Sequence, residues 1–231
     1  MPVIDKPAVQ ATTPLLLVDF DGVLNAVVGS PFRLREEMIA SNPFEAEFIA
    51  CNFPIRVPAG TRERIATLQT LFECVWATTW EDRARSDLAP VLGFGADWPI
   101  IRFTDDFPDS GTWKLPAVQR FAELPENRSW PLAWIDDDLE PDALEWAARR
   151  TRTGPRTLMV RPDADVGFTS KHFGRLLAFH DDCQLPARAG GRAARPRWPI
   201  ESDPPAGRGS LRGGNGVERP VRNGSHPTSP L

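Results

Sequence analysis

Short apolar runs that end in acidic or hydroxyl side chains recur along most of the chain, and segments with helical spacing separate them. The first run, LLLVDFD over residues 15–21, has the continuous hydrophobicity of a strand that is buried on both faces. Strands that alternate with helices predict a parallel sheet covered by helices on both sides. We therefore expect an α/β fold with three layers and a Rossmann-like topology.

The same patterns give the expected elements. Strands are predicted over residues 15–21, 74–78, 99–103, 132–136 and 157–161. Helices are predicted over residues 61–72, 80–92, 115–124, 141–149 and 169–180, the last with Thr169 as its N-cap. Ligands bind outside the carboxyl ends of the strands in such sheets, so the residues that follow each strand are the first candidates for function.

Composition divides the chain into a leader over residues 1–13, a folded domain over residues 14–185 and a tail over residues 186–231. The tail holds eight Pro, eight Gly and eight Arg but few large apolar side chains, and we expect it to be disordered, like the leader. The tail carries a net charge of +5 and the rest of the chain −9, which together give the total of −4. The basic tail is therefore the candidate for contact with nucleic acid.

The leader does not resemble a signal peptide, because an acidic residue and two prolines precede the first apolar run. That run is also too short to span a bilayer. We expect a cytoplasmic protein without a membrane partner. The three cysteines form no pairable framework and no zinc motif, and Cys74, within an apolar run, is expected to be buried.

Polar side chains follow the predicted strands in an order that fits phosphoryl transfer. A carboxylate can attack phosphorus to form an aspartyl-phosphate, and a second carboxylate can protonate the leaving group and then activate water. Clustered carboxylates repel one another unless a cation lies between them, and Mg²⁺ prefers such oxygen ligands. The residues at the strand ends are Asp19, Asp21, Gly22, Thr78, Thr79, Asp136, Asp137 and Asp138, and Lys114 comes before a predicted helix. Asp19 and Asp21, two residues apart on an extended segment, are expected to line one site.

These segments resemble a known family. DFDGVLN (19–25), the apolar strand that ends in Thr78, Lys114 and WIDDD (134–138) resemble, in order, the four motifs of the haloacid dehalogenase (HAD) superfamily of phosphohydrolases, over about residues 15–182. The resemblance implies that Asp19 is the nucleophile and Asp21 the general acid/base. It further implies that Thr78 and Lys114 hold the phosphate, and that Asp19, Asp136, Asp137 and the backbone carbonyl of Asp21 hold Mg²⁺.

A narrower likeness concerns VWATTWEDRA (75–84), WIDDDL (134–139) and RPDADVGFT (161–169). These stretches are similar to a bacterial group of HAD domains, some of which are linked to RNA-repair proteins. For a phosphomonoesterase, we rank a nucleotide or a nucleic-acid end above a phosphoprotein as the expected substrate.

Three assignments stay open. Thr78 is the preferred hydroxyl of the second motif because it directly follows the strand, and Thr79 is the alternative. We place Gly22, Thr79 and Trp80 in substrate binding; Trp80 and Trp113 either stack on a flat leaving group or wall off the site. Asp138 either faces the metal or begins a solvated helix.

The insert lengths bear on the substrate. Residues 26–60 leave room for a β-hairpin flap and a short helix, a minimal cap, and residues 93–113 are too few for a cap domain. We therefore expect an open site that suits a nucleic-acid end or a phosphoprotein, and a small nucleotide if the flap closes.

Two other functions compete with a Mg²⁺-dependent phosphomonoesterase. A receiver-like signalling module also uses acids, a threonine and a lysine around Mg²⁺, but its paired acids lie on the first strand and its phosphorylated aspartate on a central one. The order here, with the DxD segment first and the acidic triplet last, disfavours it. A non-catalytic phosphate- or nucleic-acid-binding module would be favoured by loss of the nucleophile or the acid/base, but Asp19 and Asp21 are both present.

Overall fold

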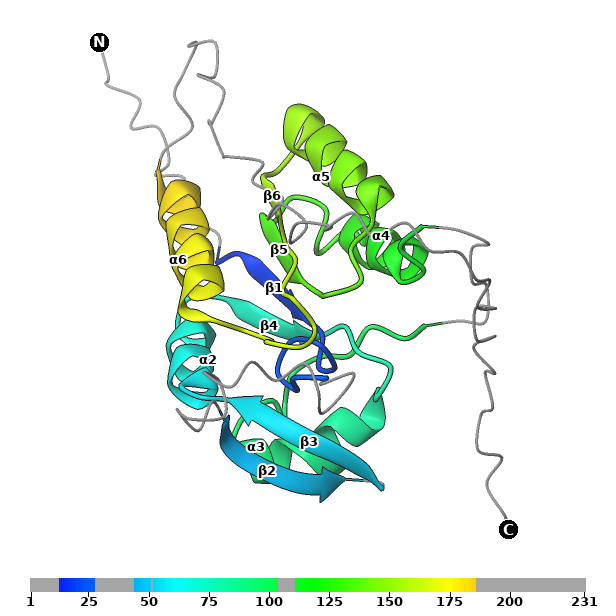
Figure 1. Ribbon diagram of the computed structural model, residues 1–231. Coiled ribbons are helices and arrows are strands. Elements are labelled where there is room, and N and C mark those ends of the chain that lie inside the picture. Colours follow the sequence, from blue (N-terminus) through cyan, green and yellow to red (C-terminus); the bar gives the residue numbers. More distant parts are fainter. Residues whose placement is uncertain (1–12, 28–43, 51, 104–110, 186–231) are drawn as a thin grey trace, which may run out of the picture. The chain divides into compact units, whose positions relative to one another are not determined.

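The computed structural model describes residues 13–27, 44–50, 52–103 and 111–185. At its centre is a parallel sheet in the order β4-β1-β5-β6 (Figure 1). Each strand ends before the polar residues that close the predicted strand, so these residues lie on the turns beyond the sheet. The strands are β1 (Leu15–Val18), β4 (Glu73–Trp76), β5 (Leu132–Ile135) and β6 (Thr157–Val160).

Alternate residues of the strands face two hydrophobic cores. Leu16 and Val18 of β1 face a core shared with α2, the π-helix η1, α3 and α6, whereas Leu15 and Leu17 face one shared with α4 and α5. Figure 1 shows α2 and α6 on one side of the sheet and α4 and α5 on the other. The expected three-layer α/β fold is therefore confirmed. The helices are α2 (Thr61–Gln69), η1 (Ala84–Leu88), α3 (Ala89–Leu92), α4 (Leu115–Glu123), α5 (Pro141–Thr153) and α6 (Ser170–Gln184).

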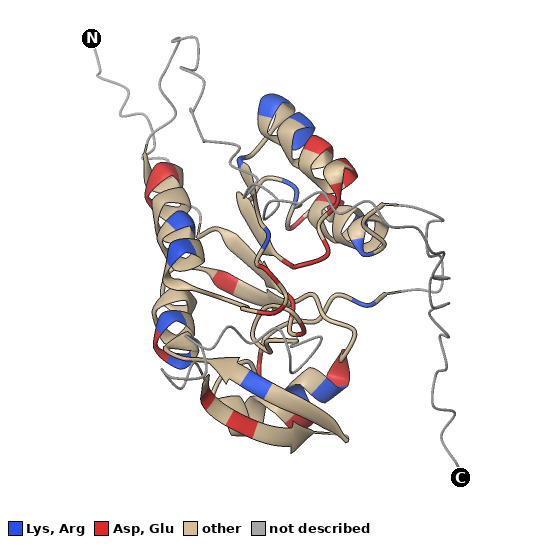
Figure 2. Cartoon of the chain, viewed as in Figure 1, with Lys and Arg blue, Asp and Glu red and all other residues tan. Residues whose placement is uncertain are grey.

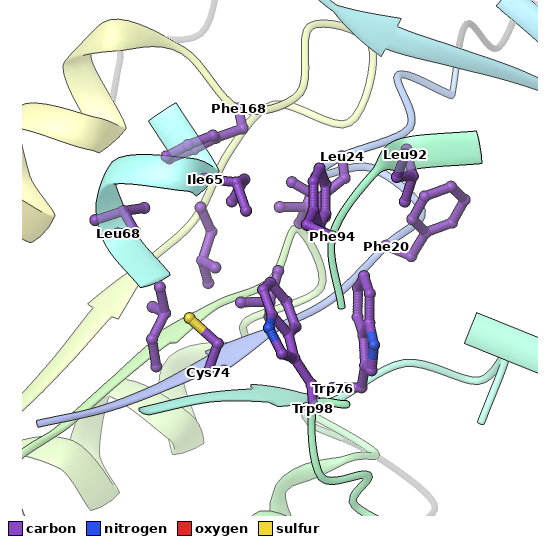
Figure 3. Packing of buried hydrophobic residues seen from close by; sticks show 14 of the residues in the cluster. Phe20, Leu24, Ile65, Leu68, Cys74, Trp76, Leu92, Phe94, Trp98 and Phe168 are labelled. Atoms are coloured by element: carbon purple, nitrogen blue, oxygen red, sulfur yellow. The ribbon is translucent and has the colours of Figure 1, made fainter. Parts of the chain in front are cut away.

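The larger core is rich in aromatic side chains (Figure 3). The ring centroids of Trp76 and Trp98 lie 4.6 Å apart, and Phe94 stacks 5.7 Å from Trp98. The indole N–H of Trp76 donates to the Gly95 carbonyl at 2.8 Å, which satisfies the polar edge of this buried ring. Cys74 is buried here as predicted, and burial raises the pKa of its thiol to about 12. Trp76, Trp134 and Trp146 are all buried.

An antiparallel hairpin of β2 (Phe44–Ala50) and β3 (Phe53–Pro58) lies within the insert that follows the first motif. Ile55 and Val57 of β3 are fully buried in the larger core, so the base of the hairpin is packed onto the domain. Residues 28–43 lie outside the described residues, and the short helix expected in the insert stays a prediction. The same holds for the disorder expected of the tail and, apart from Thr13, of the leader.

The strand expected over residues 99–103 is wrong, because only a single bridge forms there, between Ile100 and Trp76. Pro99 has no N–H to donate to a ladder. The backbone N–H of Phe103 donates instead to the side chain of Glu81 at 3.3 Å. A side chain thus takes the hydrogen bond that a longer strand would have needed.

The helix expected over residues 80–92 begins at Asp82 rather than at Trp80, and its part η1 is a π-helix. Glu81 has a left-handed backbone, with a φ of 46°, and Pro90 has no N–H for the carbonyl four residues before it. The helix ends at Leu92 before Gly93, whose φ is 83°. Residues 78–81 therefore form a turn rather than a helix next to the end of β4.

Candidate active site

The predicted site residues follow neighbouring strands of the sheet. Asp19 directly follows β1, Thr78 comes two residues after β4, and Asp136 directly follows β5. The Asp19 N–H donates to the Ile135 carbonyl at 3.0 Å, so the pairing of β1 with β5 continues up to the first site residue. Figure 2 shows acidic segments in red in the loops at the ends of the central strands. Since the strands are parallel, their carboxyl ends bring these residues to one edge.

Lys114 lies between two buried carboxylates. Its Nζ is 2.5 Å from Asp19 Oδ2 and 2.8 Å from Asp136 Oδ2, and all three residues are buried. Burial alone would lower the pKa of Lys114, but attraction to Asp19 and Asp136 outweighs it and raises this pKa, so the amine is a cation. The structure thus brings together the predicted nucleophile, the predicted phosphate-holding lysine and one predicted metal ligand.

Three carboxylates in the described part of the chain form a candidate metal centre. Asp19, Asp136 and Asp137 each offer one oxygen, and these oxygens lie within 4.8 Å of one another. If all three are ionised, Lys114 offsets only one of three negative charges. Burial raises the pKa of Asp19 to about 8, and burial together with the charge of Asp136 raises the pKa of Asp137 to about 6. Protons or a cation must relieve this repulsion, and Mg²⁺ fits a donor set made of oxygen.

Gly22 leaves the space that the Asp137 carboxylate fills. Its φ is 73°, and a Cβ at this position would lie 2.2 Å from Asp137 Cγ. The Asp137 carbonyl also accepts a hydrogen bond from Arg161 Nε at 2.9 Å, which ties the loop after β5 to the segment after β6. Gly22, which the sequence assigns to substrate binding, therefore lies against a predicted metal ligand.

The Asp21 carboxylate lies outside the cluster of three acids. Its Oδ1 accepts a hydrogen bond from Asn25 Nδ2 at 2.7 Å, and its Oδ2 accepts one from Trp80 Nε1 at 2.8 Å. The extended segment predicted to carry both Asp19 and Asp21 is not formed. The chain turns after β1, and the Phe20 carbonyl accepts the backbone N–H of Asn25 at 2.9 Å. Metal binding by Asp21 would then use its backbone carbonyl, as the resemblance implies.

The two threonines of the second motif differ in environment. Thr78 is fully buried, and its Oγ1 accepts the backbone N–H of Trp80 at 3.4 Å, whereas Thr79 is exposed. Only Thr78 is enclosed at the end of the sheet. Asp138 is also exposed, and its backbone N–H donates to Asp136 Oδ1 at 2.9 Å, so its contact with the cluster runs through the main chain.

The two tryptophans beside the motifs contact other side chains of the protein. Trp80 packs edge-on against Phe20, with ring centroids 5.7 Å apart, and against Phe53 at 6.4 Å. The ring of Trp113 lies 5.5 Å from Lys114 Nζ. Both rings therefore pack against other residues beside the site, whereas Phe53, at the tip of the hairpin, is 62% exposed.

Sequence reasoning missed two sets of supporting residues. One is Asn25, which is buried beside Asp21 and carries no sequence signal beyond the general frequency of asparagine in turns. The other is Thr112 with Asp142: the Thr112 Oγ1 donates to Asp142 Oδ1 at 2.8 Å, which ties the turn before Lys114 to the first turn of α5. The sequence did offer a signal for Asp142, because an acid in the first turn of a helix is favoured by the helix dipole.

The fold has three layers, with helices on both faces of a parallel sheet. An aspartate follows the first strand, and a buried lysine and an acidic cluster lie at the same edge of the sheet. Together these features define a domain of the HAD class. The chain belongs to the family described as the HAD domain in Swiss Army Knife RNA repair proteins, whose model matches residues 15–173, more than half of the chain. The resemblance seen in the sequence is thereby confirmed, and membership supports a hydrolase of the HAD family. No curated protein and no solved structure matches the chain. None of the described helices is long and apolar enough to cross a membrane.

Proposed function

We propose that this protein is a Mg²⁺-dependent phosphomonoesterase that forms an aspartyl-phosphate on Asp19. The observation that carries the proposal is the buried contact of Lys114 with Asp19 and Asp136, next to Asp137. Burying two acids and one lysine beside a third, half-buried acid is costly, and a structural role would be served as well by apolar side chains. The cost is explained if the site exists to bind a cation and a phosphoryl group.

In the proposed first step, an Asp19 oxygen attacks phosphorus and the bond to the leaving-group oxygen breaks, while Asp21 gives that oxygen a proton. In the second step, water loses a proton to Asp21 and attacks phosphorus, which releases phosphate and frees Asp19. Lys114 and Thr78 hold the phosphoryl oxygens. Mg²⁺, held by Asp19, Asp136, Asp137 and the Asp21 carbonyl, would neutralise the carboxylates and withdraw charge from the phosphoryl group.

We propose a nucleic-acid end, RNA above all, or a nucleotide as the substrate, ahead of a phosphoprotein. The family description, with its reference to RNA repair, supports this choice. So does Phe53, an exposed aromatic ring in contact with Trp80, which itself bonds to Asp21. An exposed ring next to a phosphate site suits a base of any identity, because every base has a face that can stack.

The test is hydrolysis of p-nitrophenyl phosphate with Mg²⁺ or a chelator, in the native protein, in Asp19→Asn and in Asp138→Asn. The Asp138 variant is the matched control, because it removes the same charge from an exposed side chain nearby. We expect activity that needs Mg²⁺, is lost in Asp19→Asn and is kept in Asp138→Asn. Activity that persists in Asp19→Asn would refute the covalent mechanism.

The substrate class is tested with RNA and DNA oligonucleotides that carry a 5′- or 3′-phosphate, and with a phosphopeptide. We expect a higher kcat/KM on a nucleic-acid end than on the peptide. A preference for the peptide would contradict the substrate proposal and leave the mechanism intact. Mg²⁺-dependent binding of phosphorylated RNA without turnover would instead identify a non-catalytic binding module.

A further inference from the structure

Two donors from different parts of the chain hold the Asp21 carboxylate, one at each oxygen. Asn25 Nδ2 donates to Oδ1 at 2.7 Å from the turn that follows β1. Trp80 Nε1 donates to Oδ2 at 2.8 Å from the turn that follows β4. A planar group that is held at both oxygens is fixed in position and in tilt.

The donors are themselves held in place. Asn25 is buried, and its Oδ1 accepts the backbone N–H of Arg56 in β3 at 2.8 Å. An N–H can only donate, so this bond determines which end of the Asn25 amide faces Arg56 and directs the NH₂ group to Asp21. Trp80 is held by the edge-on contact with Phe20, and the Arg83 guanidinium lies 5.2 Å from its ring.

This arrangement matches what the proposed acid/base requires. Each carboxylate oxygen accepts at two positions, so one bond per oxygen leaves room for a leaving-group oxygen and then for water. An amide N–H and an indole N–H keep their protons at neutral pH and therefore do not compete with Asp21 as proton donors or acceptors. We infer that Asn25 and Trp80 are positioning residues that hold Asp21 for proton transfer, an inference that rests on the proposed function.

The inference predicts a dependence on the leaving group. An alkoxide needs a proton as it departs, whereas p-nitrophenolate departs well without one, so a misplaced acid harms alkyl phosphates more than aryl phosphates. A general loss of structure would instead lower activity on both substrates alike. The ratio of the two kcat/KM values therefore separates positioning from stability.

The experiment compares p-nitrophenyl phosphate with glycerol 2-phosphate in the full-length native protein, in Trp80→Phe and in Asn25→Ala. Trp98→Phe and Asn127→Ala are matched controls, because Trp98 Nε1 donates to Gln69 and Asn127 Nδ2 donates to the Phe121 carbonyl. We expect each Asp21-linked variant to lose about tenfold in kcat/KM on the alkyl ester and about twofold or less on the aryl ester. The controls should keep the native ratio.

Crystal structures of Trp80→Phe and Asn25→Ala provide a second readout that does not need turnover. We expect the Asp21 carboxylate to move from its native position in both. An unchanged substrate ratio in both variants, or a carboxylate that stays in place in both structures, would overturn the inference. Loss of the proposed function itself would appear differently, as activity that does not depend on Asp19, and the two structures would still decide the role of Asn25 and Trp80.

Discussion

Gly22 and Gly93 both have a left-handed backbone, with φ of 73° and 83°, but they differ in what surrounds them. A Cβ on Gly22 would collide with the Asp137 carboxylate, whereas a Cβ on Gly93 would meet no described atom within 4 Å. Gly22→Ala and Gly93→Ala should therefore share a backbone cost of about 1 kcal/mol, since both put a side chain at positive φ. Only Gly22→Ala should also displace Asp137.

We expect Gly22→Ala to weaken Mg²⁺ binding by about tenfold or more, the size typical of disturbing the support of a metal ligand. Gly93→Ala should bind Mg²⁺ like the native protein. Calorimetric titration with Mg²⁺ measures both affinities. Equal affinities in the two variants would show that Asp137 is not a ligand, or that it moves without cost.

Lys114 permits a second test at the level of a single residue. Lys114→Met removes the cation between Asp19 and Asp136 and keeps the length of the side chain. We expect a loss of about 3–5 kcal/mol in the free energy of unfolding in chelator, the cost of breaking a buried ion pair. Mg²⁺ should restore more stability to this variant than to the native protein. Lys171→Met, at an exposed position of α6, is the control, and urea unfolding is the measurement.

At the level of the elements, the pattern of apolar residues predicted the sheet and most helices because these are local properties. β5 and α4 begin at their predicted residues, and α5 extends four residues beyond its prediction. The failure over residues 99–103 has a non-local cause, since the Phe103 N–H is taken by a side chain from another turn. The support of Asp21 escaped prediction for the same reason: Trp80 is 59 residues from Asp21 in the sequence.

In the candidate site, too, local features were predicted from the sequence and contacts between distant residues were not. The motifs placed Asp19, Lys114 and Asp136 correctly at one edge, because the carboxyl ends of parallel strands meet there. The direction of the Asp21 side chain was not predictable, since it depends on where β1 stops pairing and on donors contributed by other elements.

The hairpin yields a prediction about substrate binding. Phe53 lies on the same face of β3 as Ile55 and Val57. Those two side chains are buried, whereas Phe53 is 62% exposed. Ile49 is 69% exposed and pairs with Pro54, the residue next to Phe53 in β3. Phe53→Ala should raise the KM for a phosphorylated RNA end by about tenfold, the effect of losing one stacked base.

Hydrolysis of p-nitrophenyl phosphate by Phe53→Ala should change little, because this ester has no base to stack. Ile49→Ala serves as a control that also shortens an exposed apolar side chain of the hairpin. Steady-state kinetics on both substrates tests the prediction. Equal increases in KM for the RNA end in both variants would mean that Phe53 has no special role.

At the level of the whole molecule, the buried acids link stability to pH. In the absence of a cation, burial raises the pKa of Asp19 to about 8 and that of Asp137 to about 6, from the ordinary value of 3.8. The folded protein therefore holds protons that the unfolded chain has released. Stability gained in this way is complete below about pH 4 and is lost as the pH rises through 6 and then 8. The pKa values of Asp82 and Asp87 are lowered, so these two groups change the stability only in more acidic solution.

Mg²⁺ should reverse this dependence, because it binds the folded protein with its carboxylates ionised and stabilises by mass action. We expect the thermal midpoint in chelator to fall from pH 5 to pH 8, and the increase on adding Mg²⁺ to grow over the same range. Asp19→Asn should remove the decline between pH 6 and pH 8, and Asp137→Asn should lessen the decline below pH 6, since each removes one titrating group. A midpoint in chelator that rises from pH 6 to pH 8 would show that the buried acids are already ionised without a cation. The charge on Lys114 and the surrounding dipoles would then suffice to hold the acidic cluster together, and the case for a metal at this site would lose its electrostatic basis.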